Sequence, residues 1–115
     1  MRAARLTRRQ DLERIRLEGK ALRTKALLVR VSSSPQAHLR VGIVVPRHRR
    51  TAVERNTLKR RLRELVRLLV LPLGVPMDLV IWAQRAAYEM PFDGLRQEIE
   101  SLLPRLRQRD PRESP

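Results

Sequence analysis

Hydrophobic positions between Arg55 and Leu69 follow helical spacing and share their segment with a dense set of cations. On an ideal helix of roughly 100° per residue, an apolar arc about 100° wide is made by Leu58, Leu62, Leu65, Val66 and Leu69. The neighbouring arc, about equally wide, is made by Asn56, Lys59, Arg60, Arg63 and Arg67. Arg55 falls just inside the apolar arc, from where a long side chain can reach outward. The pattern predicts a helix from roughly Ala52 to Val70 that buries one stripe and presents a row of cations on its flank.

Alternating apolar and polar positions predict strands on both sides of this helix. Two strands, Ala26–Val31 and Leu39–Val45, come before it, and a buried strand, Asp78–Gln84, comes after it. The pattern leaves open whether an additional short strand forms near Ala21 to Arg23. The basic loop Arg47–Arg50 leads from the second strand into the helix.

Shorter helical patterns lie near the two ends of the chain. The first begins with a capping box at Thr7 and stops at Gly19, which suits the left-handed position after a helix. In the last, Asp93 is the expected cap and Pro104 ends or kinks the helix. The order α-β-β(-β)-α-β-α predicts a small α+β two-layer sandwich with helices against a sheet. We expect one domain over residues 1–108 and a disordered tail over residues 109–115.

Composition narrows the class of partner. The 115 residues carry a formal net charge of +14, which opposes compaction and favours a polyanion as partner. No apolar run approaches the roughly 20 residues that span a bilayer, and the N-terminal stretch lacks the apolar core of a secretory signal. Cysteine is absent, which removes disulfides, thiolate nucleophiles and thiolate metal sites. We therefore expect a cytoplasmic protein that binds nucleic acid and no membrane.

The sequence offers no arrangement typical of catalysis. His38 and His48 stand at strand ends without a partner carboxylate or cysteine, and the acidic residues are scattered. Several carboxylates, such as Glu64, lie three or four residues from an arginine, which is typical of pairs on a helix surface. Neither a glycine-rich phosphate loop nor metal-ligand spacing is present. We expect no catalytic residue and no metal ligand in this chain.

The segment from Arg40 to Glu64, RVGIVVPRHRRTAVERNTLKRRLRE, resembles the bacterial ribonuclease P protein subunit. In that family a Val-Gly strand leads through a basic loop into a helix with the pattern Ala-Val-x-Arg-Asn-x-x-Lys-Arg-x-x-Arg-Glu. The matching positions here are Ala52, Val53, Arg55, Asn56, Lys59, Arg60, Arg63 and Glu64. A generic basic helix needs cations but neither this asparagine nor this spacing, so the match is specific.

The resemblance implies both a fold and a role. The fold is that of the second domain of ribosomal protein S5, with a left-handed β-α-β crossover around the basic helix. The role is that of a protein subunit without an active site of its own. It binds a catalytic RNA, which uses magnesium to remove the 5′ leader of precursor tRNA. The residues expected to contact the catalytic RNA are Arg47, Arg55, Asn56, Lys59, Arg60, Arg63 and Arg67. The protein itself binds no cofactor and needs no obligate protein partner.

The chain departs from the family in two respects. Thr57 stands where a third basic residue often follows the asparagine, so that contact is missing or is supplied by Arg61. The groove for the leader is lined in relatives by aromatic residues of the first helix and the adjacent strand, and the corresponding residues here are Leu12, Arg16 and Arg30. Without aromatic residues, we expect the leader to be held by stacking on arginine and by phosphate contacts. Leu12 is explained equally well as a residue of the groove or of the core.

Two other classes of protein share part of this pattern. A small ribosomal or nucleoid protein has the same charge and lack of cysteine, and only the motif separates it from the ribonuclease P subunit. An amphipathic helix on a membrane surface needs bulky apolar residues facing lipid, whereas this helix needs its apolar stripe for the core. The motif therefore favours the ribonuclease P subunit.

Overall fold

The structure is a computed structural model, which describes residues 9–33 and 38–108. Its first half contains α1 (Arg9–Glu18), β1 (Lys20–Arg23), β2 (Leu27–Ser33) and β3 (Arg40–Val44). Its second half contains α2 (Ala52–Leu65), one π turn (Val66–Val70), one 3-10 turn (Leu71–Leu73), β4 (Met77–Ala83), α3 (Arg85–Glu89) and α4 (Phe92–Arg107). The predicted order of elements is confirmed, including the short strand β1.

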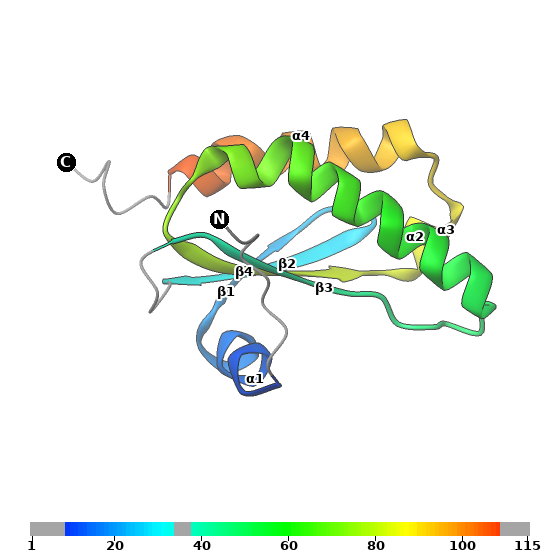
Figure 1. The fold of residues 1–115 in the computed structure, drawn as a ribbon, viewed down its shortest axis with the longest axis horizontal. Helices are drawn as coiled ribbons and strands as arrows, with labels where there is room; N and C mark the ends of the chain where they lie inside the picture. The colour runs from blue at the N-terminus through cyan, green and yellow to red at the C-terminus, as the bar shows by residue number, and fades with distance from the viewer. Residues whose placement is uncertain (1–8, 34–37, 109–115) are drawn as a thin grey trace.

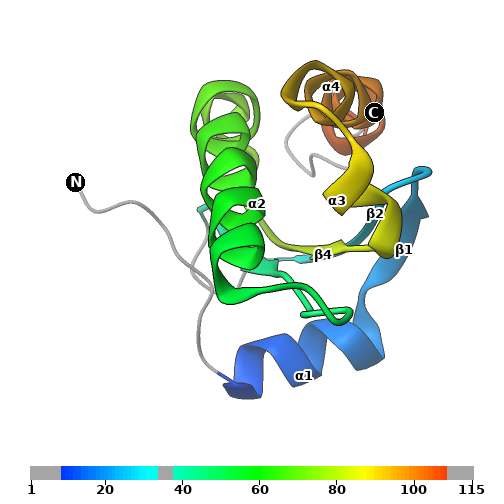
Figure 2. The same cartoon turned by 90° about the vertical axis from the view of Figure 1, so that its right-hand side faces the viewer.

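One mixed sheet with strand order β1-β2-β4-β3 forms the centre of the molecule. The pairs β1–β2 and β2–β4 are antiparallel, whereas β3 and β4 are parallel and joined through α2. From the end of β3 the chain rises into α2, runs back over the sheet and enters β4 between β3 and β2 (Figures 1 and 2). Seen along the direction in which β3 and β4 run, the chain turns counterclockwise from β3 through α2 to β4. The β-α-β crossover is therefore left-handed, whereas most such crossovers are right-handed.

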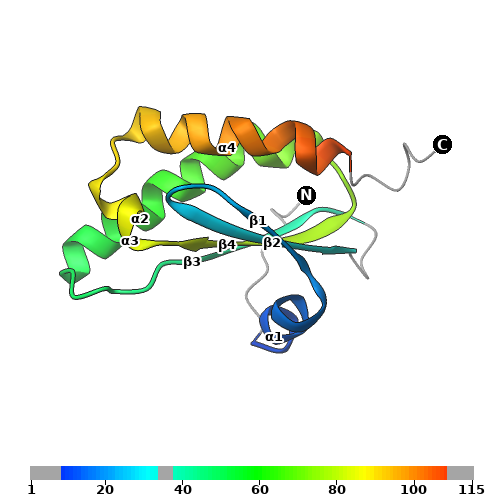
Figure 3. The same ribbon diagram turned by 180° about the vertical axis from the view of Figure 1, so that it is seen from behind.

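Helices lie on both faces of this sheet. α2 and α4 run side by side over one face, whereas α1 alone lies against the other (Figures 2 and 3). The main core fills the space between the sheet and the pair α2–α4, with Leu62, Leu79 and Leu95 among its fully buried members. A smaller cluster around Ile15 and Val80 joins α1 to the opposite face. The expected sandwich is thus the sheet with α2 and α4, to which α1 adds a cover on the far side.

The helix α2 begins with a capping box. The Glu54 amide donates to the Thr51 hydroxyl at 3.1 Å, and the Thr51 amide donates to the Glu54 carboxylate at 3.1 Å. The helical segment continues to Val70 as predicted, but its last five residues form a π turn. Pro72 supplies no N–H to a further α-helical turn, and Gly74, with φ of 61°, ends the segment.

The closing helix differs from its prediction at its N-terminus, and at its C-terminus one of the two outcomes predicted for Pro104 is excluded. Pro91 is the N-cap residue, and Asp93 lies inside the first turn, where its carboxylate pairs with Arg96 at 3.2 Å. An acidic side chain in that turn still interacts favourably with the helix dipole. Pro104 does not end the helix, which continues to Arg107. The short helix α3 was not predicted. The expected cap Thr7 and the tail 109–115 lie outside the described residues.

Candidate nucleic-acid interface

The cation row of α2, which we define as Asn56, Lys59, Arg60, Arg63 and Arg67, lies on the surface as predicted. Asn56, Arg60 and Arg63 are exposed and Lys59 is half-buried. The side chains of these four have no hydrogen-bond or ion-pair partner among residues 9–33 and 38–108. Leu58, Leu62 and Leu65 are buried in the main core and fix the rotation of the helix. The apolar stripe therefore decides which side chains face outward.

Arg67 differs from the rest of the row because it is engaged within the helix. Its guanidinium pairs with the Glu64 carboxylate, and the Nε–Oε2 distance is 3.4 Å. This hydrogen bond lowers the pKa of Glu64 and raises that of Arg67. Both side chains are largely exposed, so the pair contributes little to stability. A phosphate that contacts Arg67 has to compete with this carboxylate.

Arg55 joins α2 to the sheet. Its Nε donates to the backbone oxygen of Val45 at 2.8 Å, just beyond the end of β3, and its side chain is half-buried. This contact explains how a cation is accommodated at the border of the apolar arc. Arg55 therefore positions the helix against β3, whatever else its remaining guanidinium donors bind.

The loop between β3 and α2 is anchored on α3 by Tyr88. The Tyr88 hydroxyl donates to the Pro46 oxygen at 2.6 Å, and the Arg50 guanidinium lies 5.2 Å from the centre of the ring. Arg50 also pairs with Glu54 at 3.1 Å and with Glu89, and these hydrogen bonds raise its pKa. The contacts of Tyr88 thus give α3, which was missing from the predicted elements, a role in holding the loop.

The tip of the same loop exposes two further cations. The amide of Arg50 donates to the oxygen of Arg47 at 2.8 Å and closes a turn, inside which His48 and Arg49 have φ of 48° and 65°. Such left-handed conformations are uncommon for residues other than glycine. The side chains of Arg47 and Arg49 are exposed beside the first turn of α2. The expected contact residue Arg47 is therefore exposed in the loop that leads into α2.

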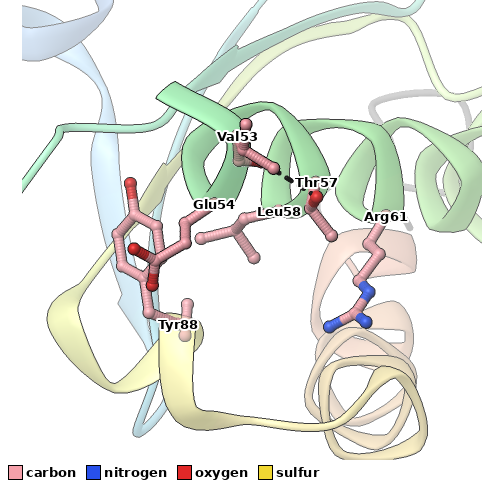
Figure 4. A pocket seen from close by; sticks show the side chains of 7 residues that line it. Val53, Glu54, Thr57, Leu58, Arg61 and Tyr88 are labelled. Atoms are coloured by element: carbon pink, nitrogen blue, oxygen red, sulfur yellow. Dashed lines mark hydrogen bonds between the residues drawn. The ribbon is translucent and has the colours of Figure 1, made fainter. Parts of the chain in front are cut away.

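Arg61 lies on the other flank of α2. On an ideal helix it is about 160° from Lys59, and it lines a shallow pocket of about 170 Å³ between α2 and α3. Figure 4 shows Val53, Thr57 and Arg61 along this side of the helix, with Tyr88 facing it from α3. The Thr57 hydroxyl donates to the Val53 oxygen at 2.9 Å. Thr57 and Arg61 thus share one flank of α2, a turn apart and away from the cation row. That Arg61 supplies the contact missing at Thr57 stays a prediction.

A buried ion-pair network holds α1 against the sheet. Asp78 is fully buried on β4 and receives two hydrogen bonds from Arg40 of β3, Nε to Oδ1 at 2.8 Å and Nη2 to Oδ2 at 2.6 Å. Arg14 of α1 donates to the same carboxylate, and Asp11 lies 3.5 Å from Arg40. The hydrogen bonds with Asp78 raise the pKa of Arg40. We call these four residues the Asp78 clamp, which no pattern in the sequence predicts.

The three residues expected at the leader groove lie around α1 and β2. Leu12 is half-buried and packs against the cluster of Ile15 and Val80. Arg16 is exposed and 3.5 Å from Glu13 on its own helix, whereas Arg30 of β2 is half-buried opposite Val80. Leu12 thus contributes to packing, and Arg16 and Arg30 are cations near the α1 face of the sheet.

The structure also places Trp82 on the face of the sheet that α1 covers in part. Its side chain is half-buried and packs against the same small cluster as Leu12. The alternation along β4 already separates Val80 and Trp82 from Leu79 and Ile81. The sequence does not show which of these two faces α1 covers, and so it did not single out Trp82. The structure places α1 on the side of Val80 and Trp82.

Residues 9–33 and 38–108 contain no group of three or more His, Asp or Glu side chains that could hold a metal ion. Over the same residues, no helix is both long enough and apolar enough to cross a membrane.

Fold and surface together define a class: a small basic α+β protein whose exposed cation row suits a polyanion. The family model described as ribonuclease P matches residues 1–107. The chain is 37% identical to the ribonuclease P protein component of Chloroflexus aurantiacus over 103 residues, covering 89% of this chain and 76% of the relative. It is 38% identical to that of Symbiobacterium thermophilum over 105 residues, covering 90% and 91%. The chain therefore belongs to the ribonuclease P protein component family.

Solved structures agree with this assignment. The ribonuclease P protein of Thermotoga maritima superposes with a TM-score of 0.76 at 32% identity, covering 88% of this chain and 96% of that one. The Staphylococcus aureus protein has the same fold, with a TM-score of 0.81 at 24% identity over 91% and 96%. Members of this family are components of an endoribonuclease holoenzyme that processes tRNA. Membership therefore implies that this chain has the ribonuclease P RNA as a partner.

Proposed function

We propose that this chain is the RNA-binding subunit of ribonuclease P and that α2 docks it on the catalytic RNA. The observation that carries the proposal is the exposure of Asn56, Arg60 and Arg63 in one row, without a partner among the described residues. Lys59 and Arg67 complete the row, and Arg55 and Arg47 flank it. Side chains that are not paired within the protein are available to phosphates at the least cost.

The physical contribution of the subunit is electrostatic. The catalytic RNA and precursor tRNA are both polyanions, and their repulsion opposes complex formation. A protein of charge +14 lodged between them lowers this repulsion and the magnesium concentration needed to overcome it. Magnesium supplies the chemistry within the RNA, while residues of this chain bind and orient the two RNAs. No side chain of the protein takes part in hydrolysis.

The second contact of the subunit is with the 5′ leader of precursor tRNA. The α1 face of the sheet supports this contact through Arg30 on β2 and Arg16 on α1. The Asp78 clamp holds α1 in place beside it, and Leu12 packs beneath. We assign the protein to the cytoplasm with the catalytic RNA and precursor tRNA as partners, and with no obligate protein partner.

The test is cleavage of a 5′-labelled precursor tRNA by the cognate catalytic RNA at low magnesium, with and without the protein. We expect strong stimulation that is largely lost in the double variant Lys59→Ala, Arg63→Ala. The matched control is Lys25→Ala, Arg105→Ala, which removes the same charge from exposed positions outside α2 and its preceding loop. Absence of stimulation by the unaltered protein, or equal losses in the two variants, contradicts the proposal.

A further inference from the structure

The α1 face of the sheet is arranged in cross-strand rows, and α1 covers only part of them. Strand register places Arg23, Leu28, Trp82 and Val44 in one row across β1, β2, β4 and β3. The next rows hold Val80 and Asp78, which α1 contacts through Ile15 and Arg14. The ends of β3 and β4 that lead to α2 and α3 extend beyond α1 (Figures 1 and 3). The row of Trp82 therefore lies at the open end of this face.

The indole of Trp82 is fixed in place but keeps a free donor. The ring is half-buried and packs against the cluster of Ile15 and Val80. In the described part of the chain, no buried side-chain nitrogen or oxygen lacks a hydrogen-bond partner, and Trp82 Nε1 has no such partner. The indole N–H must therefore reach solvent. A tryptophan buried only for packing usually finds a partner for this group.

Charge around the indole favours a single-stranded nucleic acid as the occupant. Arg23 is exposed at the end of the Trp82 row, and Arg30 lies in the next row beside Val80. The row of Trp82 and the row of Val80 contain no carboxylate in any of the four strands. An aromatic surface flanked by cations is the arrangement that binds unpaired nucleotides, with the bases stacked and the phosphates neutralised. A second copy of this chain, also of charge +14, is repelled from the same surface.

We propose that Trp82 is the platform on which one unpaired base of the precursor leader stacks, with Arg30 and Arg23 at the adjacent phosphates. The inference rests on the proposed function and adds a specificity-determining residue to it. Trp82 supplies from β4 the aromatic surface that α1 and β2 do not provide at Leu12, Arg16 and Arg30. A single platform predicts a contact with one nucleotide rather than with a run of bases.

The first test uses Trp82 as its own probe, because the chain contains a single tryptophan. Holoenzyme assembled from the unaltered protein and the catalytic RNA is mixed with three precursors: one with a leader of several nucleotides, one with a single-nucleotide leader, and one with a long abasic leader. We expect tryptophan fluorescence to be quenched by the long leader and much less by the other two. Equal quenching by the abasic leader overturns base stacking, because that leader keeps only the phosphates.

The second test measures the ratio of affinities for the long-leader and single-nucleotide-leader precursors. Loss of one stacked base is worth about 1–3 kcal/mol, which corresponds to about 5- to 150-fold in affinity. We expect Trp82→Leu to reduce the ratio by that amount and Trp82→Phe to retain most of it. Phe92→Leu is the matched control, since Phe92 is a half-buried aromatic residue packed against the main core. An unchanged ratio in Trp82→Leu overturns the inference.

Failure of the inference is distinguishable from failure of the proposed function. If the unaltered protein stimulates cleavage but neither quenching nor the affinity ratio depends on the bases of the leader, only the role of Trp82 is wrong. If the unaltered protein does not stimulate cleavage of any precursor, the proposed function fails first. Circular dichroism of Trp82→Leu establishes that the variant is folded before its affinities are compared.

Discussion

Arginine side chains in this chain divide into two groups, of which the sequence pattern predicted only the exposed one. Arg40 and Arg14 bind the buried carboxylate of Asp78, and Arg55 binds the backbone of Val45. Arg60 and Arg63 face solvent without a partner among the described residues. The first group satisfies polar atoms inside the fold, and the second is available for phosphates. The difference is decided by what lies opposite each side chain.

Asp78→Asn tests the first group of arginines. Because the neutral amide removes the buried negative charge with which Arg40 and Arg14 pair, we expect the free energy of unfolding to fall by about 3–5 kcal/mol. Urea denaturation followed by circular dichroism measures the change. The control is Asp93→Asn, which breaks an exposed pair with Arg96 and is expected to cost less than about 1 kcal/mol. Equal effects of the two substitutions contradict a stabilising role for the clamp.

At the scale of elements, a side chain of one segment supplies the hydrogen-bond partner that the backbone of a distant segment needs. The Glu98 carboxylate of α4 accepts hydrogen bonds from the Ala26 amide at 2.6 Å, the Lys25 amide at 3.2 Å and the Thr24 hydroxyl at 3.0 Å. These groups belong to the turn between β1 and β2, in which the Thr24 amide donates to the Leu27 oxygen at 2.9 Å and the next two amides donate to Glu98. A side chain more than 70 residues away along the chain thus satisfies this turn.

Glu98→Ala tests this link between α4 and the hairpin. Since Ala26 is fully buried, its amide is left without a partner, and we expect a loss of about 1–3 kcal/mol in the free energy of unfolding. Hydrogen exchange at the Ala26 amide is expected to accelerate more than exchange within α2. Glu100→Ala on the exposed side of α4 is the control. If exchange at Ala26 is unchanged in Glu98→Ala, the link does not protect the turn.

At the scale of the whole molecule, the two candidate RNA-binding surfaces lie on different faces. The α2 flank carries the cation row, and the α1 face carries Trp82 with Arg30 and Arg23. The molecule measures 44 × 29 × 28 Å. The cation row and the Trp82 surface are separate, so each can contact a different RNA at the same time. This arrangement suits a subunit that lies between a catalytic RNA and its substrate.

The salt dependence of binding tests this whole-molecule view. Each phosphate contact contributes about 0.7–0.9 to the slope of log affinity against log salt. We expect Lys59→Ala, Arg63→Ala to reduce the slope for the catalytic RNA by roughly 1.4–1.8, measured by filter binding over a range of potassium chloride concentrations. Lys25→Ala, Arg105→Ala is expected to change it much less. Similar reductions in both variants indicate diffuse attraction rather than contacts of the row.

Local patterns predicted the strands and α2 but not every helix boundary. Alternation identified β2, β3 and β4 to within two residues, because each strand has one face in the main core. The helix α3 was missed because its five residues are too few for a periodic pattern. The residue pattern predicts Asp93 as the cap of α4, although Pro91 holds that position, since capping depends on backbone geometry as well as on the residue type.

The sequence by itself determined every strand and helix except α3, the charged flank of α2 and the family, because these depend on periodicity and on spacing along the chain. Leu58, Leu62 and Leu65 oblige the helix to bury one stripe, so the exposure of Arg60 and Arg63 follows from helical geometry. Only the tertiary structure decided the Asp78 clamp, the contact of Arg55 with Val45 and the place of Trp82 beside α1. These depend on which segments meet across the sheet, and that choice is made by packing of the whole core rather than by any local pattern.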